Sequence, residues 1–273
     1  MKIPFRGEIN QLLHQARFKL SANNFLLYIA FYRFFYRPKK NSLAKIIQHY
    51  SRSLRNELQV IQIGANDGMR HDPIHKFIKS DNWKGVLLEP QPYVYNKYLK
   101  RLYKRSNDIH TMCAAIGEND GVQPLYRIGF SNMRWATGLA SFVREQVVKA
   151  FENGLVADRC AKYGIAIPEN KSEHIIAEEV AVISPTTLIK KYAIDNIDLL
   201  MIDTEGFDYE VIKIFNVEKT KPHMIIYENE HLSSGDNQSC ESLLRRNSYR
   251  LKHFHSNTVA VQEPLGVMEE FFK

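Results

Sequence analysis

The stretch LQVIQIGANDG, from Leu58 to Gly68, decides the fold of this chain. Its apolar first half predicts a β-strand over residues 58–63, which runs directly into a loop that begins at Gly64. Apolar residues at helical spacing over 74–78 predict a helix after the loop. A strand, a glycine loop and a helix in this order bring free backbone N–H groups and the positive end of the helix dipole to a ligand. The stretch therefore predicts a cofactor-binding edge of a sheet.

The alternation of short apolar runs with helical stretches continues to the C-terminus. Further strands are expected at 85–88, 109–112, 197–202, 223–227, 249–252 and 258–261. Ser256 and Asn257 lie between the last two strands and predict a hairpin turn. Strands that alternate with helices are typical of a parallel sheet covered on both faces. The predicted fold class is therefore α/β, a mostly parallel sheet with a C-terminal antiparallel hairpin, and its order resembles the methyltransferase variant of the Rossmann fold.

One catalytic domain with an extension is expected, because the 273 residues show no repeat, linker or low-complexity tract. We assign residues 1–55 to an N-terminal helical extension and residues 56–273 to the catalytic domain. The segment at about 117–185 is too long for a simple connection and contains helical material over 140–151. It is expected either to form walls of a substrate site or to be a structural elaboration. The three cysteines are far apart, so a reducing compartment without a disulfide framework is expected.

Carboxylates beside the glycine loop indicate the kind of cofactor. The loop GANDG lacks the third glycine of the dinucleotide fingerprint, and Asp67 lies where a dehydrogenase would bind a pyrophosphate. A carboxylate there repels phosphate but suits the ammonium of a methionine moiety. Glu89 ends the second strand 21 residues after Gly68, where an acidic side chain can accept hydrogen bonds from both ribose hydroxyls. Asp203, at the end of a third strand, strengthens the pattern.

With these residues the chain resembles the FkbM-type methyltransferases. The resemblance rests on IQIGANDG (Ile61–Gly68), Asp72-Pro73, GVLLEPQP (Gly85–Pro92), CAAIGENDG (Cys113–Gly121), LLMIDTEGFDYEVI (Leu199–Ile212) and IIYENEH (Ile225–His231). It implies a Rossmann-like class I sheet and an S-adenosylmethionine-dependent O-methyltransferase that acts on a hydroxyl of a sugar, glycan, lipid or other small metabolite. It also implies that the glycine loop holds the methionine part, Glu89 the ribose, and the strand end Cys113–Ala115 the adenine. The implied cofactor-binding residues are Ile63, Gly64, Ala65, Asn66, Asp67, Gly68, Glu89, Pro90, Ala114, Ala115 and Asp203.

Methyl transfer to a hydroxyl requires that the protein align the acceptor oxygen, and a general base can assist. Asp203 and Glu228 end neighbouring expected strands, so their carboxylates are expected to converge over the cofactor. His71 follows the glycine loop and His231 follows Glu228, so both are further candidates for the base. The alternative for Asp203 is that, with Thr204, it only caps the following helix.

Glu205 lies near the N-terminus of the same expected helix, where a carboxylate is favourable in any case. Together with Asp203, Glu228 and His231 it can also form an oxygen-rich site for a divalent cation. Because charge-paired carboxylates give the same spacing, we assign no metal.

The stretch FLLYIAFYRFFY, Phe25–Tyr36, is apolar and aromatic, and the basic sequence RPKK follows it. It predicts a helix that is capped by Ser21 or Asn23 and ended by Pro38. The run is shorter than the ~20 apolar residues that cross a bilayer, so a spanning anchor is the least favoured reading. No small-residue cleavage site follows, which disfavours a secretory signal. The helix is expected either to pack on the catalytic domain, where it can cover the substrate cleft, or to lie in a membrane interface.

The net charge of +7 permits acidic partners without requiring them. A second basic stripe has helical spacing and is either the solvated face of a helix or a site for an acidic partner: Lys97, Lys100, Arg101, Lys104 and Arg105. The expected partner is a small-molecule, glycan or lipid acceptor, with a peripheral membrane contact through residues 25–40. Nucleic acid is not expected, and the expected location is cytoplasmic, with membrane association left open.

Three other functions compete with this interpretation. The positive charge is compatible with an RNA methyltransferase, but no basic motif with interleaved aromatic residues supports it. A nicotinamide-dependent oxidoreductase is disfavoured by the incomplete glycine fingerprint and by Asp67. A catalytically silent binding module that keeps the fold is the third.

Overall fold

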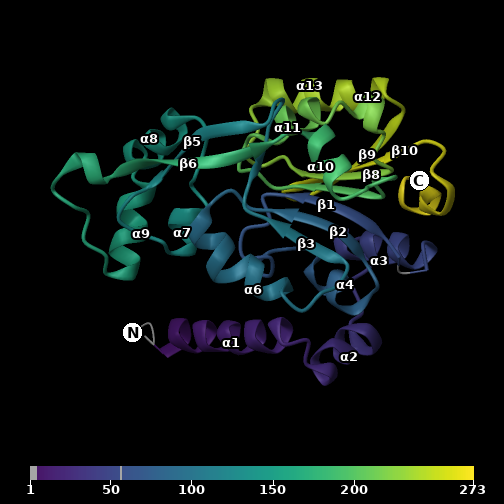
Figure 1. Ribbon diagram of the computed structural model, residues 1–273, viewed down its shortest axis with the longest axis horizontal. Helices are drawn as coiled ribbons and strands as arrows, with labels where there is room; N and C mark the ends of the chain where they lie inside the picture. Colours follow the sequence, from purple (N-terminus) through teal and green to yellow (C-terminus); the bar gives the residue numbers. More distant parts are fainter. Residues whose placement is uncertain (1–4, 56) are drawn as a thin grey trace.

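The computed structural model describes residues 5–55 and 57–273 and contains a central seven-stranded sheet (Figure 1). Its strands are β1 Gln59–Ile63, β2 Lys84–Leu88, β3 Ile109–Met112, β7 Leu199–Ile202, β8 Met224–Glu228, β9 Tyr249–Phe254 and β10 Asn257–Gln262. They lie in the order β3-β2-β1-β7-β8-β10-β9, and β10 is antiparallel to both of its neighbours while the other pairs are parallel. The predicted fold class is therefore confirmed.

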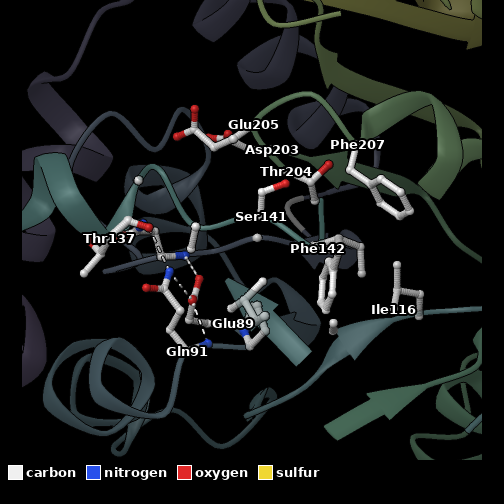
Figure 2. A pocket seen from close by; sticks show the side chains of 18 of the residues that line it. Glu89, Gln91, Ile116, Thr137, Ser141, Phe142, Asp203, Thr204, Glu205 and Phe207 are labelled. Atoms are coloured by element: carbon white, nitrogen blue, oxygen red, sulfur yellow. Dashed lines mark hydrogen bonds between the residues drawn. The ribbon is translucent and has the colours of Figure 1, made fainter. Parts of the chain in front are cut away.

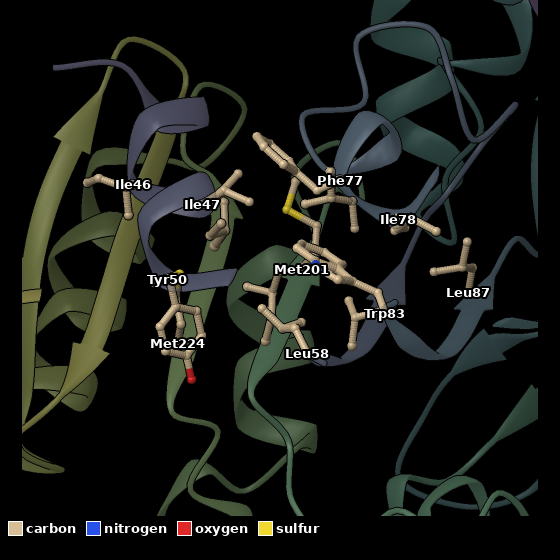
Figure 3. Packing of buried hydrophobic residues seen from close by; sticks show 14 of the residues in the cluster. Ile46, Ile47, Tyr50, Leu58, Phe77, Ile78, Trp83, Leu87, Met201 and Met224 are labelled. Atoms are coloured by element: carbon tan, nitrogen blue, oxygen red, sulfur yellow. The ribbon is translucent and has the colours of Figure 1, made fainter. Parts of the chain in front are cut away.

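Both faces of this sheet are buried, because alternate residues of each strand enter two separate cores. The first core packs the sheet against α3 Leu43–Ser53, α4 His75–Ser80 and α6 Lys100–Tyr103. Figure 3 shows Ile46, Ile47 and Tyr50 of α3 within it. The second core packs the sheet against α10 Pro185–Lys191, α11 Asp208–Ile214 and α13 Ser234–Arg246. The remaining helical segments here are α5 Pro92–Val94, a π-helical turn Tyr95–Leu99, α12 Val217–Thr220 and a 3₁₀ helix Gly266–Phe271.

The register of the parallel strands brings three predicted site residues to one edge. Ile63, the last residue of β1, lies opposite Leu88 of β2 and Ile202 of β7. The residues that follow these three are Gly64, Glu89 and Asp203. Because parallel strands end at the same edge of the sheet, these residues leave the sheet side by side.

The segment between β3 and β7 forms a small sheet with helices of its own. Its strands are β4 Ala115–Ile116, β5 Gly121–Ile128 and β6 Ile175–Ile183, in the order β4-β6-β5. Its helices are α7 Arg134–Thr137, α8 Arg144–Glu152, α9 Leu155–Tyr163 and a 3₁₀ turn Lys171–Glu173. The expected helix over 140–151 corresponds to α8, whereas β5 has no apolar run because its first four residues are exposed. Figure 1 shows this unit projecting to one side of the main sheet.

The N-terminal residues form α1 Phe5–Ala22 and α2 Leu26–Phe35, which lie along one edge of the molecule beneath α6 and α4 (Figure 1). A helix in the apolar stretch was predicted correctly, and it ends at Phe35, before Pro38, but neither expected N-cap is used. The N-cap of α2 is Phe25, which makes no side-chain capping bond. Ser21 is instead buried in α1, with its Oγ 3.1 Å from His75 Nε2, and Asn23 donates to the Lys19 carbonyl. In the described part of the chain, no helix is both long enough and apolar enough to cross a membrane.

Candidate active site

A cavity opens at the carboxyl edge of the main sheet, and several chain segments line it. The sheet edge contributes residues at or beyond the ends of four strands: Ile63, Gly64 and Asn66 at the end of β1, Glu89, Pro90 and Gln91 after β2, Ala114 and the β4 residues Ala115 and Ile116 after β3, and Asp203, Thr204 and Glu205 after β7. The rest of the lining comes from Phe207, Val211 and the small sheet unit, including Arg134, Thr137, Ser141 and Phe142. Figure 2 shows Glu89 and Gln91 in one part of this cavity, Asp203 and Glu205 in a second, and Phe142, Phe207 and Ile116 in a third. The site therefore has acidic parts and an apolar part.

Gly64 is required by the way β1 leaves the sheet. Its φ is +77°, in the left-handed region that favours glycine, and a Cβ at this position would lie 1.9 Å from the carbonyl oxygen of Asp203. The N–H groups of Gly64 and Ala65 both reach the Leu88 carbonyl, at 3.1 and 2.8 Å. This close approach fixes the ends of β1, β2 and β7 against one another at the cavity.

Glu89 is a buried carboxylate that organises the glycine loop. Its Oε2 accepts a hydrogen bond from Asn66 N–H at 2.9 Å, and its Oε1 accepts from the N–H and the Nε2 of Gln91 at 3.0 and 3.2 Å. Gln91 Nε2 also donates to the Thr137 carbonyl at 3.0 Å, which ties the sheet edge to α7. Burial raises the pKa of Glu89 to about 7 although these hydrogen bonds act in the opposite direction.

Two carboxylates after β7 and one guanidinium set the electrostatics of the cavity. Burial raises the pKa of Asp203, and burial followed by the charge of Asp203 raises the pKa of Glu205 to about 7. The positive charge of Arg134 on α7 acts in the opposite direction on the pKa of Asp203, Glu205 and Glu89, but it is a smaller effect than burial. Arg134 Nε is buried and has no hydrogen-bond partner in the described part of the chain. Arg134 is thus a cation in a cavity with three buried or half-buried acids.

Glu205, His231 and Glu228 form a chain of polar groups beside the cavity. His231 Nε2 lies 3.3 Å from Glu205 Oε2 and 3.9 Å from Glu228 Oε2. Burial, and then the charges of Asp203 and Glu205, raise the pKa of Glu228 to about 8. One ligand atom from each of Glu205, Glu228 and His231 lies within 4.8 Å of the others, a geometry compatible with a divalent cation. Of the four residues in the metal hypothesis, the structure groups these three and leaves Asp203 outside the group.

Asp208, which the sequence interpretation did not single out, is the carboxylate that ties the acidic strand ends together. It is fully buried in the first turn of α11 and accepts from Thr204 N–H at 3.2 Å, from Thr204 Oγ1 at 2.8 Å and from Glu228 N–H at 3.1 Å. Burial raises its pKa to about 6. The capping alternative is wrong, because the N-cap of α11 is Phe207 and makes no side-chain capping bond. Asp203 lines the cavity instead.

The structure brings most of the predicted cofactor residues to this cavity. Eight of the eleven line it: Ile63, Gly64, Asn66, Glu89, Pro90, Ala114, Ala115 and Asp203. Ala65, Asp67 and Gly68 are not in its lining. The Asp67 carboxylate accepts from Met69 N–H and Arg70 N–H at 2.9 and 2.7 Å and lies 3.7 Å from His14 Nε2 of α1. In the structure Asp67 therefore holds its own loop and contacts the N-terminal helix.

The candidate bases also divide into residues that line the cavity and residues that do not. Asp203 lines the cavity, while Glu228 and His231 lie behind Glu205, which lines it. His71 is exposed, has a φ of +62° and is not part of the lining. The lining residues that were not named individually from the sequence are Gln91, Phe207, Val211 and those of the small sheet unit. The segment 117–185 as a whole was expected either to form walls of a substrate site or to be a structural elaboration, and part of it lines this cavity. Gln91 stands inside the quoted motif GVLLEPQP, which was the available signal.

The strand order, the glycine turn and the acidic strand ends define a Rossmann-like fold of the methyltransferase class. The family model of the methyltransferase FkbM domain matches residues 62–251, so the chain belongs to this family and the resemblance seen in the sequence is confirmed. No curated protein matches the chain by sequence.

Solved structures of other methyltransferases are similar at low identity. The methyltransferase FkbM from Methylobacillus flagellatus KT is 14% identical with a TM-score of 0.44, and the match covers 93% of this chain and 60% of that one. The precorrin-6y C5,15-methyltransferase from Geobacter metallireducens GS-15 is 12% identical with a TM-score of 0.37, covering 84% and 94%. The O-methyltransferase from Bacillus cereus, in complex with SAH, is 9% identical with a TM-score of 0.37, covering 88% and 100%.

Proposed function

We propose that this protein is an S-adenosylmethionine-dependent O-methyltransferase that methylates a hydroxyl of a sugar, a glycan, a lipid or another small metabolite. The observation that carries the proposal is the cavity at the carboxyl edge, where the Gly64 turn, the buried Glu89 and the acidic Asp203 meet. Membership of the FkbM methyltransferase family supports the reaction class. The hydroxyl acceptor follows from the family resemblance of the sequence.

The residues of the cavity fit this cofactor. Glu89 would hold one ribose hydroxyl, because a carboxylate has about four acceptor positions and protein donors use three of them, which leaves one free. The apolar part around Ile116 and Phe142 would hold the adenine. Two buried polar atoms of the lining, Arg134 Nε and Gln91 Oε1, have no partner among the described residues. A polar ligand that satisfies them removes a desolvation cost, and the carboxylate of a methionine moiety is a suitable partner for Arg134.

When bound, S-adenosylmethionine supplies a methyl group already activated by the positive sulfonium. Transfer of this methyl group to a hydroxyl would require the cavity to align the acceptor oxygen and to take up the hydroxyl proton. Asp203 and Glu205 both line the cavity and are placed to orient the hydroxyl. Glu205, with a pKa of about 7, would accept the proton, and His231, whose Nε2 lies 3.3 Å from Glu205 Oε2, would hold its carboxylate in position. The cluster of carboxylates also favours a cation in the cavity.

Calorimetry with S-adenosylmethionine, S-adenosylhomocysteine and NAD tests the proposal. Tight binding of both S-adenosyl compounds is expected, followed by methyl transfer from labelled cofactor to one class in a hydroxyl acceptor screen. Preferential binding of NAD would point to the oxidoreductase, and binding of none of the three to the silent module. Steeply salt-dependent binding and methylation of RNA would point to the nucleic-acid alternative.

Glu89→Ala tests the ribose assignment, and its unfolding transition is measured alongside binding because Glu89 also holds the N–H groups of Asn66 and Gln91. We expect this variant to fold and to bind S-adenosylhomocysteine about 100-fold more weakly, because a charge-assisted hydrogen-bond acceptor is lost from a buried site. Glu152→Ala on the exposed face of α8 is the matched control and should bind as the natural protein does. Unchanged affinity in a folded Glu89→Ala protein would remove Glu89 from the cofactor site.

A further inference from the structure

The excess of positive over negative charge is confined to the N-terminal part of the chain. Residues 1–56 contain 11 Lys and Arg but one acidic residue, Glu8, and none occurs from residue 9 to 56. Residues 57–273 contain 26 Lys and Arg and 29 Asp and Glu, a formal charge of −3. The overall charge of +7 is therefore not a general property of the surface. It belongs to α1, α2 and the residues that follow them.

The same region carries an exposed apolar face. No residue of α2 is buried, and Leu27, Phe31, Phe34 and Phe35, at i, i+4, i+7 and i+8, share one side of the helix. Their exposed fractions are 74%, 56%, 60% and 71%. Leu26 and Phe25 at the N-terminal end of α2 are exposed as well. A contiguous set of large apolar side chains on one helix marks an interaction surface.

This face is held in place from behind, so its exposure is not the result of a loose helix. Arg33 Nε donates to the Ser80 carbonyl of α4 at 2.8 Å. The Tyr36 ring, just after α2, lies 6.0 Å from that of Phe77, between ring centroids. At the turn between α1 and α2, Asn24 accepts from Lys79 Nζ at 2.9 Å. The catalytic domain thus presents α2 with its apolar side outward.

We propose that α2 and the basic residues beside it form a docking surface for an anionic lipid bilayer. The apolar face is rimmed by cations, with Arg37, Lys39 and Lys40 exposed after α2 and Arg17 and Lys19 exposed on α1. A helix of this kind lies in the headgroup region, where its apolar side enters the acyl chains and Lys and Arg meet lipid phosphates. Ten residues are too few to cross the bilayer, so the contact is peripheral.

The bilayer fits the surface better than the other occupants do. A second copy of the chain, bound face to face, would bring two strongly basic segments together, and like charges repel. A nucleic acid would use the cations but would leave the Leu and Phe side chains without an apolar partner. An anionic membrane satisfies both features at once, and the surface stands independently of the reaction at the cavity.

Co-sedimentation of the full-length chain with vesicles tests this proposal. The vesicles contain phosphatidylcholine alone or with about 30 mol% phosphatidylglycerol. We expect binding to the anionic vesicles that is at least about tenfold tighter than to the neutral ones and that weakens with salt. Equal binding to both kinds of vesicle, or binding to neither, would overturn the proposal.

Two sets of variants assign the binding to the surface. Leu27→Ala/Phe31→Ala/Phe34→Ala keeps good helix formers and should weaken binding to anionic vesicles about tenfold or more. Arg37→Glu/Lys39→Glu/Lys40→Glu should do the same. Its matched control reverses three exposed cations on α8 and α9, Arg144→Glu/Lys149→Glu/Lys162→Glu, and should bind as the natural chain does. If the control lost as much binding to anionic vesicles as the α2 variants, the binding would depend on overall charge and not on a docking surface at α2.

A tryptophan within the face reports how deeply the face enters the bilayer. Leu27→Trp should shift its emission to shorter wavelength on anionic vesicles and be quenched by lipids brominated on the acyl chains. Absence of quenching in a protein that binds vesicles would contradict insertion of this face. A dimer in light scattering that becomes monomeric in the triple alanine variant would assign the face to a second copy instead. Tighter binding to RNA, unaffected by that variant, would assign the cations to nucleic acid.

Discussion

The carboxyl edge of the sheet and the helical pair α1–α2 are opposite in charge and in burial. At the edge, burial raises the pKa of five carboxyl groups: Glu89, Asp203, Glu205, Asp208 and Glu228. On α1 and α2, the charged side chains that the structure describes are basic, and large apolar side chains are exposed. The sheet edge therefore buries carboxyl groups, which are normally solvated, and the helical pair exposes large apolar side chains, which are normally buried.

Neither arrangement is favourable for folding alone. Crowded carboxyl groups in a poorly solvated edge destabilise their own charged forms, and exposed Leu and Phe side chains forgo the free energy of burial. We interpret both regions as preformed for ligands that complete them, a cationic nucleoside with hydroxyls at the edge and an anionic lipid surface at the helices. The predictions below alter one region at a time, beginning with the largest expected effect.

Gly64→Ala should abolish the function of the edge. The new Cβ would lie 1.9 Å from the Asp203 carbonyl oxygen and would require a side chain at a φ of +77°. Displacement of β1 from β7 is expected to cost about 4 kcal/mol or more of stability and to remove measurable S-adenosylhomocysteine binding in calorimetry. Gly121→Ala, in open space on β5, is the control and should retain stability and binding. A stable Gly64→Ala protein that binds the cofactor would disprove the close approach of Gly64 to the Asp203 carbonyl.

Asp203→Asn should lower turnover while leaving the cofactor bound. Asparagine keeps the shape but loses the negative charge that faces the cavity, so kcat is expected to fall about 10²-fold. S-adenosylhomocysteine affinity should change by about threefold or less, because Glu89 and the glycine turn remain. Asp158→Asn, on the exposed side of α9, is the control. An undiminished kcat in Asp203→Asn would show that Asp203 does not orient the acceptor hydroxyl. A parallel loss of S-adenosylhomocysteine affinity would show that Asp203 binds the cofactor.

The burial of the sheet also explains which parts of the fold and the site could be predicted from the sequence. The strands were predictable because both sides of the sheet are buried, so residues such as Val60 and Ile61 are both apolar. The convergence of Gly64, Glu89 and Asp203 was predictable as well, since parallel strands end at one edge. These parts of the site depend only on strand order and register.

The remaining site residues depend on features that have no local signature. Arg134 and Phe142 reach the cavity through the path of a long segment with its own sheet. Whether Asp203 or Asp208 faces the cavity is decided by where α11 begins, and helix ends are set by tertiary contacts as much as by sequence. The acidic Asp67 was assigned to the ligand by its position, but nearby backbone N–H groups compete for such a side chain.

A pH series tests whether the edge is destabilised by its own charge. Burial raises the pKa of Glu89 to about 7 and that of Glu228 to about 8, and burial with the charge of Asp203 raises that of Glu205 to about 7, far above their values in an unfolded chain. Between pH 6.5 and 8 the folded protein therefore binds more protons than the unfolded one, and the unfolding free energy must fall as the pH rises. The Tm without cofactor is expected to be a few degrees higher at pH 6.5 than at pH 8.

The window ends near pH 6.5 because buried His75, whose pKa is lowered to about 3, then acts in the opposite direction. Below its ordinary pKa a histidine gains a proton in the unfolded chain but not in this folded one, so acid removes stability. Glu228→Gln should reduce the difference between the two pH values, since one raised carboxyl group is removed. A Tm that is equal at both pH values, or higher at pH 8, would show that these carboxyl groups are solvated.

The smallest effect is expected on α2, and its smallness is informative. Leu27→Ala should change the unfolding free energy by less than about 0.5 kcal/mol, because a side chain that is 74% exposed has little burial to lose. Ile47→Ala on α3, at 1% exposure, is the matched comparison and should cost about 2–5 kcal/mol in denaturant unfolding. If the two losses were similar, α2 would be packed against the chain and its face would not be free for a membrane. A difference of several kcal/mol would mean that stability does not account for leucine at position 27, and that the reason for it lies in what the helix contacts.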